Sequence, residues 1–166
     1  MINRRRFLTS TASFVIVGIQ PTRGWSSFEI TLTKKEWREI LSPAQYAILR
    51  EWKTERPFSS SLYGEKSNLL NENRTGEYCC AGCGLALYSS ENKYDSGTGW
   101  PSFWKPILGN VDYRDDRHFF KILVEVHCRR CGGHLGHVFD DGPDPTGKRY
   151  CINSVTLQFN KTEAET

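Results

Sequence analysis

The sequence predicts an α+β fold that is mainly β, with a short helical segment followed by an antiparallel β domain. Three observations lead to this expectation. Two helix-start signals lie close together before residue 57, and from Glu77 onward short β-prone runs alternate with Gly, Asn, Asp and Pro. Five Trp, seven Tyr and nine Phe among 166 residues supply enough large apolar surface for a core, which argues against a disordered chain.

Residues 1–25 have the composition of an export leader. Arg4, Arg5 and Arg6, followed by an apolar pair, resemble the twin-arginine signal, which exports folded proteins. Residues 12–19 are apolar but fall short of the roughly 20 residues that span a bilayer. We expect export to a bacterial periplasm and a domain at residues 26–166. No Ala-x-Ala cleavage site follows, so organelle targeting or a cytoplasmic protein with a basic tail are the alternatives.

The positive charge of the chain belongs to this leader. The formal net charge is +3, and residues 1–25 carry four arginines and no acidic residue. Removing these four charges leaves −1 for the remainder, in which no basic stripe is evident. Nucleic-acid binding needs clustered Lys and Arg to neutralise phosphates, so we expect no nucleic-acid partner.

Two helices are expected next. Residues 33–36 and residues 42–45 each have the form of a capping box, in which a Ser or Thr and a Glu or Gln three positions on satisfy free backbone donors. Proline follows the second cap, at the first helical position, where its missing N–H costs nothing. The second helix should run for about three turns and end before Pro57. Its expected buried face carries Tyr46, Leu49 and Trp52.

Four β-prone runs are expected as strands: residues 85–88, 118–126, 134–139 and 155–159. The second run alternates, with one mixed face and one fully apolar face. The apolar face carries Phe120, Ile122, Val124 and Val126. Such alternation is typical of a strand that is buried on one side.

Four of the six cysteines form two Cys-x-x-Cys pairs, Cys80 with Cys83 and Cys128 with Cys131, each followed by glycine. Such a turn aims two thiolates at one tetrahedral ion, and two turns complete a closed, structural Cys₄ zinc site. We therefore expect one zinc ion. Disulfides or a redox dithiol are the alternatives. Cys79 is expected to be a buried thiol, with a resolving role as the alternative.

Cys151 is the cysteine expected to react. Arg149 and Asn153 lie two positions to either side, so on a strand they would share its face, and the cation would lower the pKa of the thiol. Two upstream motifs carry acid and base groups, His134, His137, Asp140 and Asp141. Trp100 lies in a Gly-flanked aromatic turn at residues 97–104 that could form the wall of an apolar pocket.

Three motifs in order give the chain a specific resemblance. Residues 94–103 (YDSGTGWPSF), 134–139 (HLGHVF) and 142–154 (GPDPTGKRYCINS) resemble the signatures of methionine-(R)-sulfoxide reductases, the MsrB family, and the two Cys-x-x-Cys pairs lie where that family binds zinc. The resemblance extends from about Glu36 to Phe159. It implies two antiparallel β-sheets with peripheral N-terminal helices and the zinc away from the reactive face.

The resemblance also implies the chemistry. Cys151 would attack the sulfur of methionine-(R)-sulfoxide in an oxidised protein and become a sulfenic acid, which repairs the methionine. His137, with His134 beside it, would donate or organise the proton. Trp100 would pack against the substrate methyl group. The residues expected to tune the thiolate and hold the hydrogen-bond network are Arg149, Asp141 and Asn153.

Two positions depart from the family pattern. Thr98 stands where many members carry the cysteine that resolves the sulfenic acid, so the chain should need an external thiol reductant: thioredoxin-like, glutaredoxin-like or of low molecular weight. Leu123 stands where an arginine is usual, with little expected effect. We expect a monomer. A zinc-ribbon-like binding module is the alternative from another class, whereas a zinc hydrolase is disfavoured because a closed Cys₄ site leaves no open coordination position.

Overall fold

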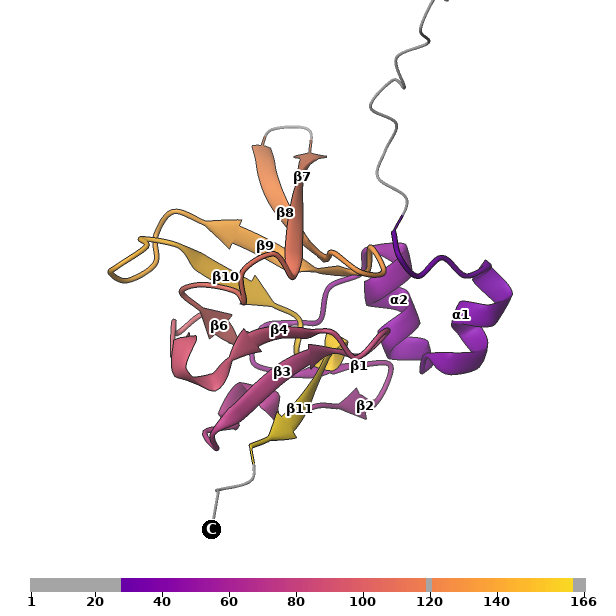
Figure 1. Cartoon of the computed structure of the whole chain (residues 1–166), viewed down its shortest axis with the longest axis horizontal. Coiled ribbons are helices and arrows are strands. Elements are labelled where there is room, and N and C mark those ends of the chain that lie inside the picture. The colour runs from indigo at the N-terminus through magenta and orange to yellow at the C-terminus, as the bar shows by residue number, and fades with distance from the viewer. Residues whose placement is uncertain (1–27, 119–120, 163–166) are drawn as a thin grey trace, which may run out of the picture.

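The computed structural model describes residues 28–118 and 121–162. The expected export leader, residues 1–25, lies outside the described residues. Within these two ranges no helix is long and apolar enough to cross a membrane. The fold is mainly β with two short helices and antiparallel sheets, which confirms the predicted class (Figure 1).

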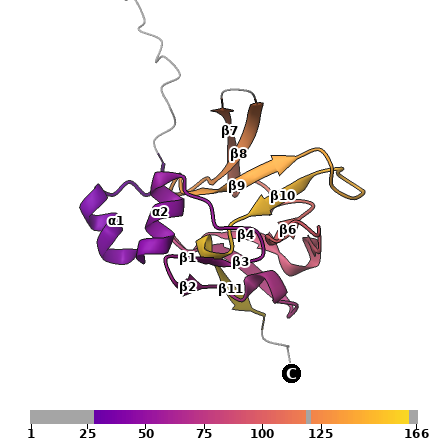
Figure 2. The same ribbon diagram turned by 180° about the vertical axis from the view of Figure 1, so that it is seen from behind.

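Both helices begin as their capping boxes predict. Helix α1 spans Lys34–Ile40 and α2 spans Pro43–Glu51, and each cap shows both reciprocal hydrogen bonds. The two helices lie beside each other at one end of the larger sheets (Figure 1 and Figure 2). Tyr46 and Leu49 are buried as expected, but Trp52 is not. It ends α2 in a left-handed conformation, which turns its ring off the buried face and leaves it 59% exposed.

The described strands form three antiparallel sheets. The six-stranded sheet has the order β5 (Lys93–Tyr94), β6 (Ser102–Phe103), β10 (Arg149–Ile152), β9 (His134–Phe139), β8 (Lys121–Cys128) and β7 (Val111–His118). The three-stranded sheet has the order β11 (Leu157–Lys161), β3 (Gly76–Cys80) and β4 (Ala86–Ser89). A small hairpin joins β1 (Ser61–Leu62) and β2 (Glu65–Lys66).

The expected strand positions are close to those observed, with shifted ends. Residues 134–139 match β9 fully, and 85–88 shift by one residue. Val155 lies in a short 3₁₀ turn, Ser154–Thr156, before β11 begins. His118 ends β7, so the run 118–126 crosses the hairpin turn rather than forming one strand.

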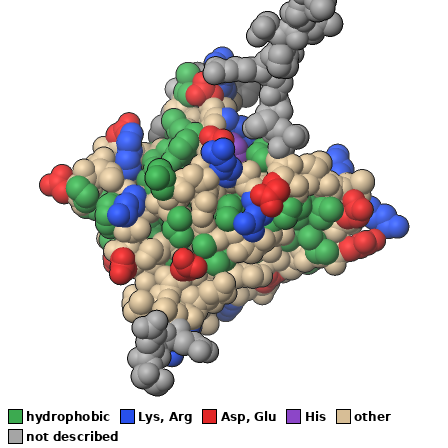
Figure 3. All heavy atoms as spheres, viewed as in Figure 1, with side chains coloured by type: hydrophobic (Ala, Val, Ile, Leu, Met, Phe, Trp, Pro, Cys, Tyr) green, Lys and Arg blue, Asp and Glu red, His purple; other side chains and the backbone are tan. Residues whose placement is uncertain are grey.

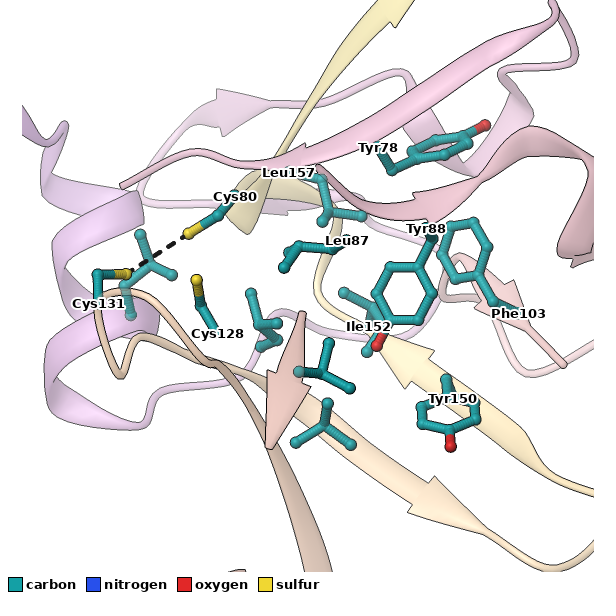
Figure 4. Close-up of a cluster of buried hydrophobic side chains, with 14 of the residues drawn as sticks. Tyr78, Cys80, Leu87, Tyr88, Phe103, Cys128, Cys131, Tyr150, Ile152 and Leu157 are labelled. Atoms are coloured by element: carbon teal, nitrogen blue, oxygen red, sulfur yellow. Dashed lines mark hydrogen bonds between the residues drawn. The ribbon is translucent and has the colours of Figure 1, made fainter. Parts of the chain in front are cut away.

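The core lies between the two larger sheets. Tyr78 of β3, Tyr88 of β4 and Phe103 of β6 are fully buried (Figure 4). The ring of Phe103 stacks on Tyr88 at 4.3 Å between centroids and meets Tyr78 edge-on at 4.9 Å. Because these rings come from both sheets, their contacts fix β6, the neighbour of β10, against the three-stranded sheet.

The β7–β8 hairpin projects beyond this core (Figure 1). Val126 is buried, but Ile122 is 64% exposed and Val124 is 40% exposed. The expectation that this strand buries one whole face is therefore wrong for its distal half. The reason is the length of the hairpin: β7 and β8 each span eight residues, and their distal part projects away from the rest of the fold (Figure 1).

Candidate active site

One row of cross-strand neighbours brings the reactive residues together. Cys151 on β10 pairs with His137 on β9 and, on its other side, with Ser102 on β6. His137 in turn pairs with Glu125 on β8, and Glu125 with Arg114 on β7. Directly opposed residues of an antiparallel pair project to the same face, with Cβ atoms about 4.5–5.5 Å apart. The predicted thiol and the predicted proton donor are therefore neighbours on one face.

A β-bulge adds the second histidine to this row. The register of β8 with β9 shifts, so that Val126 faces Gly136 but His127 faces His134. Residues three apart on a regular strand point to opposite faces, and the extra residue of the bulge cancels that inversion. The rings of His134 and His137 consequently meet at 5.4 Å between centroids, edge to face.

Cys151 is partly buried, with a hydroxyl and a cation nearby. Thr98 Oγ1 lies 3.7 Å from its sulfur. Arg149 shares its face, and the guanidinium Nε and Nη2 donate to the two carboxylate oxygens of Asp141 at 2.8 and 2.9 Å. Burial raises the pKa of the Cys151 thiol, and the lowering by Thr98 and Arg149 does not fully offset it. The expected net lowering of this pKa is therefore wrong, because burial outweighs the cation.

His137 has an anionic partner that the sequence did not indicate. Its Nε2 lies 2.8 Å from Oδ2 of Asp116, which projects from β7. Burial lowers the pKa of His137, and the hydrogen bond to Asp116 acts in the opposite direction. Asp116 lies two residues after Arg114 on β7, so both side chains project to the face that carries Glu125 and His137. The contact between Asp116 and His137 therefore follows from the register of the hairpin, which the sequence does not reveal.

His134 is held by a buried carboxylate. Its Nδ1 lies 2.7 Å from Oε1 of Glu125, which also accepts from Trp52 Nε1 and Arg114 Nη2, both at 2.9 Å. Burial raises the pKa of Glu125, but the hydrogen bonds from His134 and Arg114 outweigh it and lower the value to about 2. His134 therefore has little freedom to turn, and sequence reasoning missed the anion that fixes it.

Asn153 does not extend the strand as expected, since β10 ends at Ile152. Its side chain instead accepts from the Glu55 N–H at 3.1 Å and donates to the Leu135 carbonyl at 3.0 Å. The Glu55 carboxylate, itself buried, accepts from the N–H and hydroxyl of Ser154 at 2.6 and 2.9 Å. Both residues thus fix the turn that follows Cys151. Burial raises the pKa of Glu55.

Trp100 lies in the loop between β5 and β6, beside a groove of about 560 Å³. Phe58, Tyr94 and Pro101 line this groove with it, whereas Cys151 is not among the lining residues. The Phe58 N–H donates to the Gly99 carbonyl at 2.9 Å and so holds the Trp100 loop against the segment that follows α2.

The four cysteines of the Cys-x-x-Cys pairs converge at the other end of the core. All four sulfurs lie within 4.8 Å of one another, with Cys80 and Cys131 at 3.7 Å and Cys83 and Cys128 at 3.5 Å. Figure 4 shows Cys80, Cys128 and Cys131 of this cluster. Zinc–sulfur bonds of about 2.3 Å in a tetrahedron require sulfurs about 3.8 Å apart. The residues therefore fit a zinc ion. Cys79 is buried on β3 and accepts from Asn160 Nδ2 at 3.3 Å.

Fold and site together fit a thiol oxidoreductase, with the cysteine predicted to react, Cys151, between His137 and Ser102 on neighbouring strands. Residues 41–161 match the SelR domain family. Curated relatives called peptide methionine sulfoxide reductase MsrB are 53% identical over 134 residues in Methanosarcina barkeri (80% of this chain, 89% of the relative) and 46% identical over 136 residues in Leptospira interrogans (81% and 98%). The chain belongs to this SelR, or MsrB, family.

A third relative of the same name, from Bradyrhizobium diazoefficiens, is 51% identical over 132 residues, which cover 79% of this chain and 90% of the relative. A solved structure of the Mis18 "Yippee-like" domain covers 55% of this chain at a TM-score of 0.45 and 17% identity. That likeness is too weak to bear on the site.

Proposed function

We propose that this protein is a peptide-methionine (R)-S-oxide reductase, which returns methionine-(R)-sulfoxide in oxidised proteins to methionine. The observation that carries the proposal is the pairing of Cys151 with His137 across neighbouring strands, on the face that also presents Arg149. This pairing supports the proposal because a thiol, an imidazole and a cation then lie on one face of the sheet, where they can serve as nucleophile, proton donor and thiolate stabiliser. Family membership supplies the substrate class.

The reaction begins with attack of the Cys151 sulfur on the sulfoxide sulfur. This attack forms a sulfur–sulfur bond while His137 protonates the sulfoxide oxygen. The hydroxyl group then moves to Cys151: a sulfur–oxygen bond forms on Cys151 as the sulfur–sulfur bond and the sulfur–oxygen bond of the substrate break, which leaves a sulfenic acid and free methionine. The sulfoxide is reduced by two electrons and Cys151 is oxidised by two. His134, held by Glu125, orients His137 through the edge-to-face contact of their rings.

The remaining predicted site residues have supporting roles in this proposal. Arg149, held by Asp141, stabilises the thiolate of Cys151 against the effect of burial. Asn153 fixes the end of β10 through backbone contacts. Trp100 packs against the methyl group of the substrate at the edge of the groove that it lines.

The sulfenic acid is reduced by an external thiol. One thiol condenses with it, releasing water and leaving a mixed disulfide, and a second thiol then frees Cys151 as a disulfide forms between the two. Thr98 supports this route because it is the side chain 3.7 Å from the sulfur and carries no thiol. Cys79 is buried in the other large sheet, which disfavours it as a resolving thiol. A thioredoxin-like, glutaredoxin-like or low-molecular-weight thiol fits this role.

One structural zinc ion held by the Cys₄ cluster completes the proposal. Zinc supplies folding energy there and takes no part in the reaction, because four protein ligands close its coordination. Export to the periplasm by the twin-arginine route remains the localisation that residues 1–25 favour, with residues 26–166 as a monomeric enzyme domain.

The test uses the full chain with dithiothreitol and the separate R and S epimers of dabsylated methionine sulfoxide. We expect reduction of the R epimer only, lost in Cys151→Ser and retained in the matched control Cys79→Ser. Absence of turnover by folded, zinc-loaded protein would favour the binding-module alternative. Loss of activity in Cys79→Ser, with the fold intact, would instead make Cys79 a participant.

A further inference from the structure

A continuous chain of hydroxyl groups ends at the reactive sulfur. Thr98 Oγ1 lies 3.7 Å from Cys151 Sγ and 2.8 Å from Ser96 Oγ. Ser96 Oγ lies 2.7 Å from Ser102 Oγ, and the Ser102 hydroxyl donates to the Trp100 carbonyl at 3.1 Å. The four contacts run from the sulfur through three side chains to one backbone oxygen.

The protons of this chain match its contacts when Cys151 is a neutral thiol. There are then four donors, one S–H and three O–H, for four contacts, and each hydroxyl can donate once. Since the Ser102 proton is directed to the Trp100 carbonyl, Ser96 donates to Ser102 and Thr98 donates to Ser96. The thiol proton completes the series by pointing at Thr98. Every contact holds one proton, all in the direction away from the sulfur.

Ionisation of Cys151 removes one of these protons and changes the favoured direction. A thiolate only accepts, so Thr98 must turn its hydroxyl toward the sulfur to solvate the charge. Ser96 then donates to Thr98, and Ser102 donates to Ser96. The last contact, from Ser102 to the Trp100 carbonyl, loses its proton. The thiolate therefore gains one charged hydrogen bond while the far end of the chain loses a neutral one.

We propose that Thr98, Ser96 and Ser102 are positioning residues whose hydrogen bonds reverse together when Cys151 ionises, so that this chain sets the fraction of reactive thiolate. Thr98 acts directly, as the donor to the thiolate. Ser96 acts through Thr98, whose proton it accepts in the thiol state, and Ser102 acts in turn through Ser96. The inference deepens the proposed function and rests on Cys151 as its nucleophile.

Charged and titratable groups also face Cys151 from the neighbouring elements. Arg149 comes from β10 itself and His137 from β9, while Asp141 follows β9 and Tyr94 lies on β5. Arg149 favours the thiolate and Asp141 opposes it. The hydroxyl chain differs from these groups because it is neutral and partly buried, so salt should leave its effect unchanged.

The experiment measures the pKa of Cys151 in the full chain from the pH dependence of its alkylation by iodoacetamide, read on the peptide that contains Cys151. We expect Thr98→Val to raise this pKa by about one unit, because the thiolate loses a hydrogen bond. Ser96→Ala should lower it by about half a unit, because Thr98 then has no competing acceptor. Two hydroxyl residues in direct contact, Thr98 and Ser96, are thus expected to shift the pKa of Cys151 in opposite directions when they are replaced.

Thr98→Ser keeps the donor and should restore the native pKa of Cys151. Ser89→Ala removes a hydroxyl from a turn that is not part of the hydroxyl series, and it should leave this pKa unchanged. If Ser96→Ala unfolds the protein, Ser102→Ala gives the same test, again with a lower pKa expected. Shifts of the same sign in Thr98→Val and Ser96→Ala, or no shift in either, would overturn the inference. Alkylation does not require turnover, so a failure of the proposed function would be seen separately.

Discussion

At the scale of single residues, the proposed proton donor, His137, contacts a carboxylate from another strand of the sheet. His137 is partly buried, which lowers its pKa, and Asp116 counteracts this through a hydrogen bond of 2.8 Å. A proton donor works best when its pKa lies near the pH at which the reaction runs. Asp116 therefore offsets part of the lowering of the His137 pKa that burial causes.

The variant Asp116→Asn should lower the pKa of His137, since the amide has no charge to favour the imidazolium. Protonated His137 would then be lost at lower pH, and the alkaline decline of turnover should move to lower pH with it. An NMR titration of the histidine ring measures the shift directly. Asp115→Asn, on the opposite face of β7, is the matched control. An unchanged His137 pKa in Asp116→Asn would show that the contact does not influence protonation.

Glu125 should couple the stability of the fold to acid. Its folded pKa of about 2 lies below its ordinary value of 4.5, so the folded state favours the carboxylate. The resulting stability is fully present above about pH 4.5 and is lost as the pH falls through about 2. The free energy of unfolding of Glu125→Gln, measured by urea titration, should fall less steeply than that of the native chain over this window. Parallel acid limbs for the two proteins would contradict the expected coupling.

The motifs pointed to candidate reactive residues but not to the acidic residues that contact them. Cys151, His137 and the four clustered cysteines have side chains whose chemistry is legible from type and spacing alone. Glu55, Asp116 and Glu125 are ordinary acidic residues in the sequence. They reach the site through a hairpin register or through contacts up to 99 positions apart, which no local pattern encodes.

At the scale of elements, β9 and β10 approach each other closely beside Cys151. A Cβ atom on Gly136 would lie 2.1 Å from the Cys151 carbonyl oxygen, so the backbones would have to separate. Gly136 also lies at the bulge that brings the two histidines together. The spacing between Cys151 and His137 therefore depends on the absence of a side chain at Gly136.

Gly136→Ala should destabilise the protein by about 1–3 kcal/mol, as overpacking does. It should also reduce turnover by about 100-fold, because a displacement of about 1 Å between reacting groups has that effect. Thermal unfolding and steady-state turnover measure the two changes. Gly109→Ala is the control: it strains a backbone at φ of +80° in open space and should leave turnover intact. Native activity in Gly136→Ala would show that the strands tolerate the separation.

The helices and β8 illustrate what sequence patterns can specify about elements. Capping boxes predicted both helix starts because the contacts that define them lie within four residues. The alternation in β8 correctly indicated a strand, but periodicity gives the direction of a side chain and not what covers it. Ile122 and Val124 share the face of Val126 but remain largely exposed, at 64% and 40%.

At the scale of the whole molecule, the cysteine cluster joins parts that otherwise meet mainly through apolar packing. Cys80 and Cys83 follow from the three-stranded sheet, and Cys128 and Cys131 follow from β8 in the six-stranded sheet. Arg50 of α2 also donates to the Cys131 carbonyl at 2.9 Å. One ion would thus connect both sheets and a helix.

Basic and acidic side chains are mixed on the face shown in Figure 3, without a large patch of one sign.

Loss of the metal should therefore unfold the protein rather than only slow it. Structural zinc contributes on the order of 10–16 kcal/mol in small peptides, which is comparable to the stability of a whole domain. Cys83→Ser or Cys131→Ser should lose both metal and fold, as measured by metal analysis and circular dichroism. Cys79→Ser, one position from the cluster, serves as the control. A Cys83→Ser protein that remains folded and zinc-loaded would contradict a four-thiolate site.

The bond between Glu55 and Ser154 also has a consequence for the order in which the molecule forms during synthesis. Glu55 leaves the ribosome early but finds its partner 99 positions later, whereas Cys80 and Cys131 are 51 positions apart. Contacts that close longer loops cost more entropy and tend to form late. The clustered thiols therefore close shorter loops than the Glu55–Ser154 contact and can gather first, whereas the turn beyond Cys151 is fixed only once Ser154 reaches Glu55.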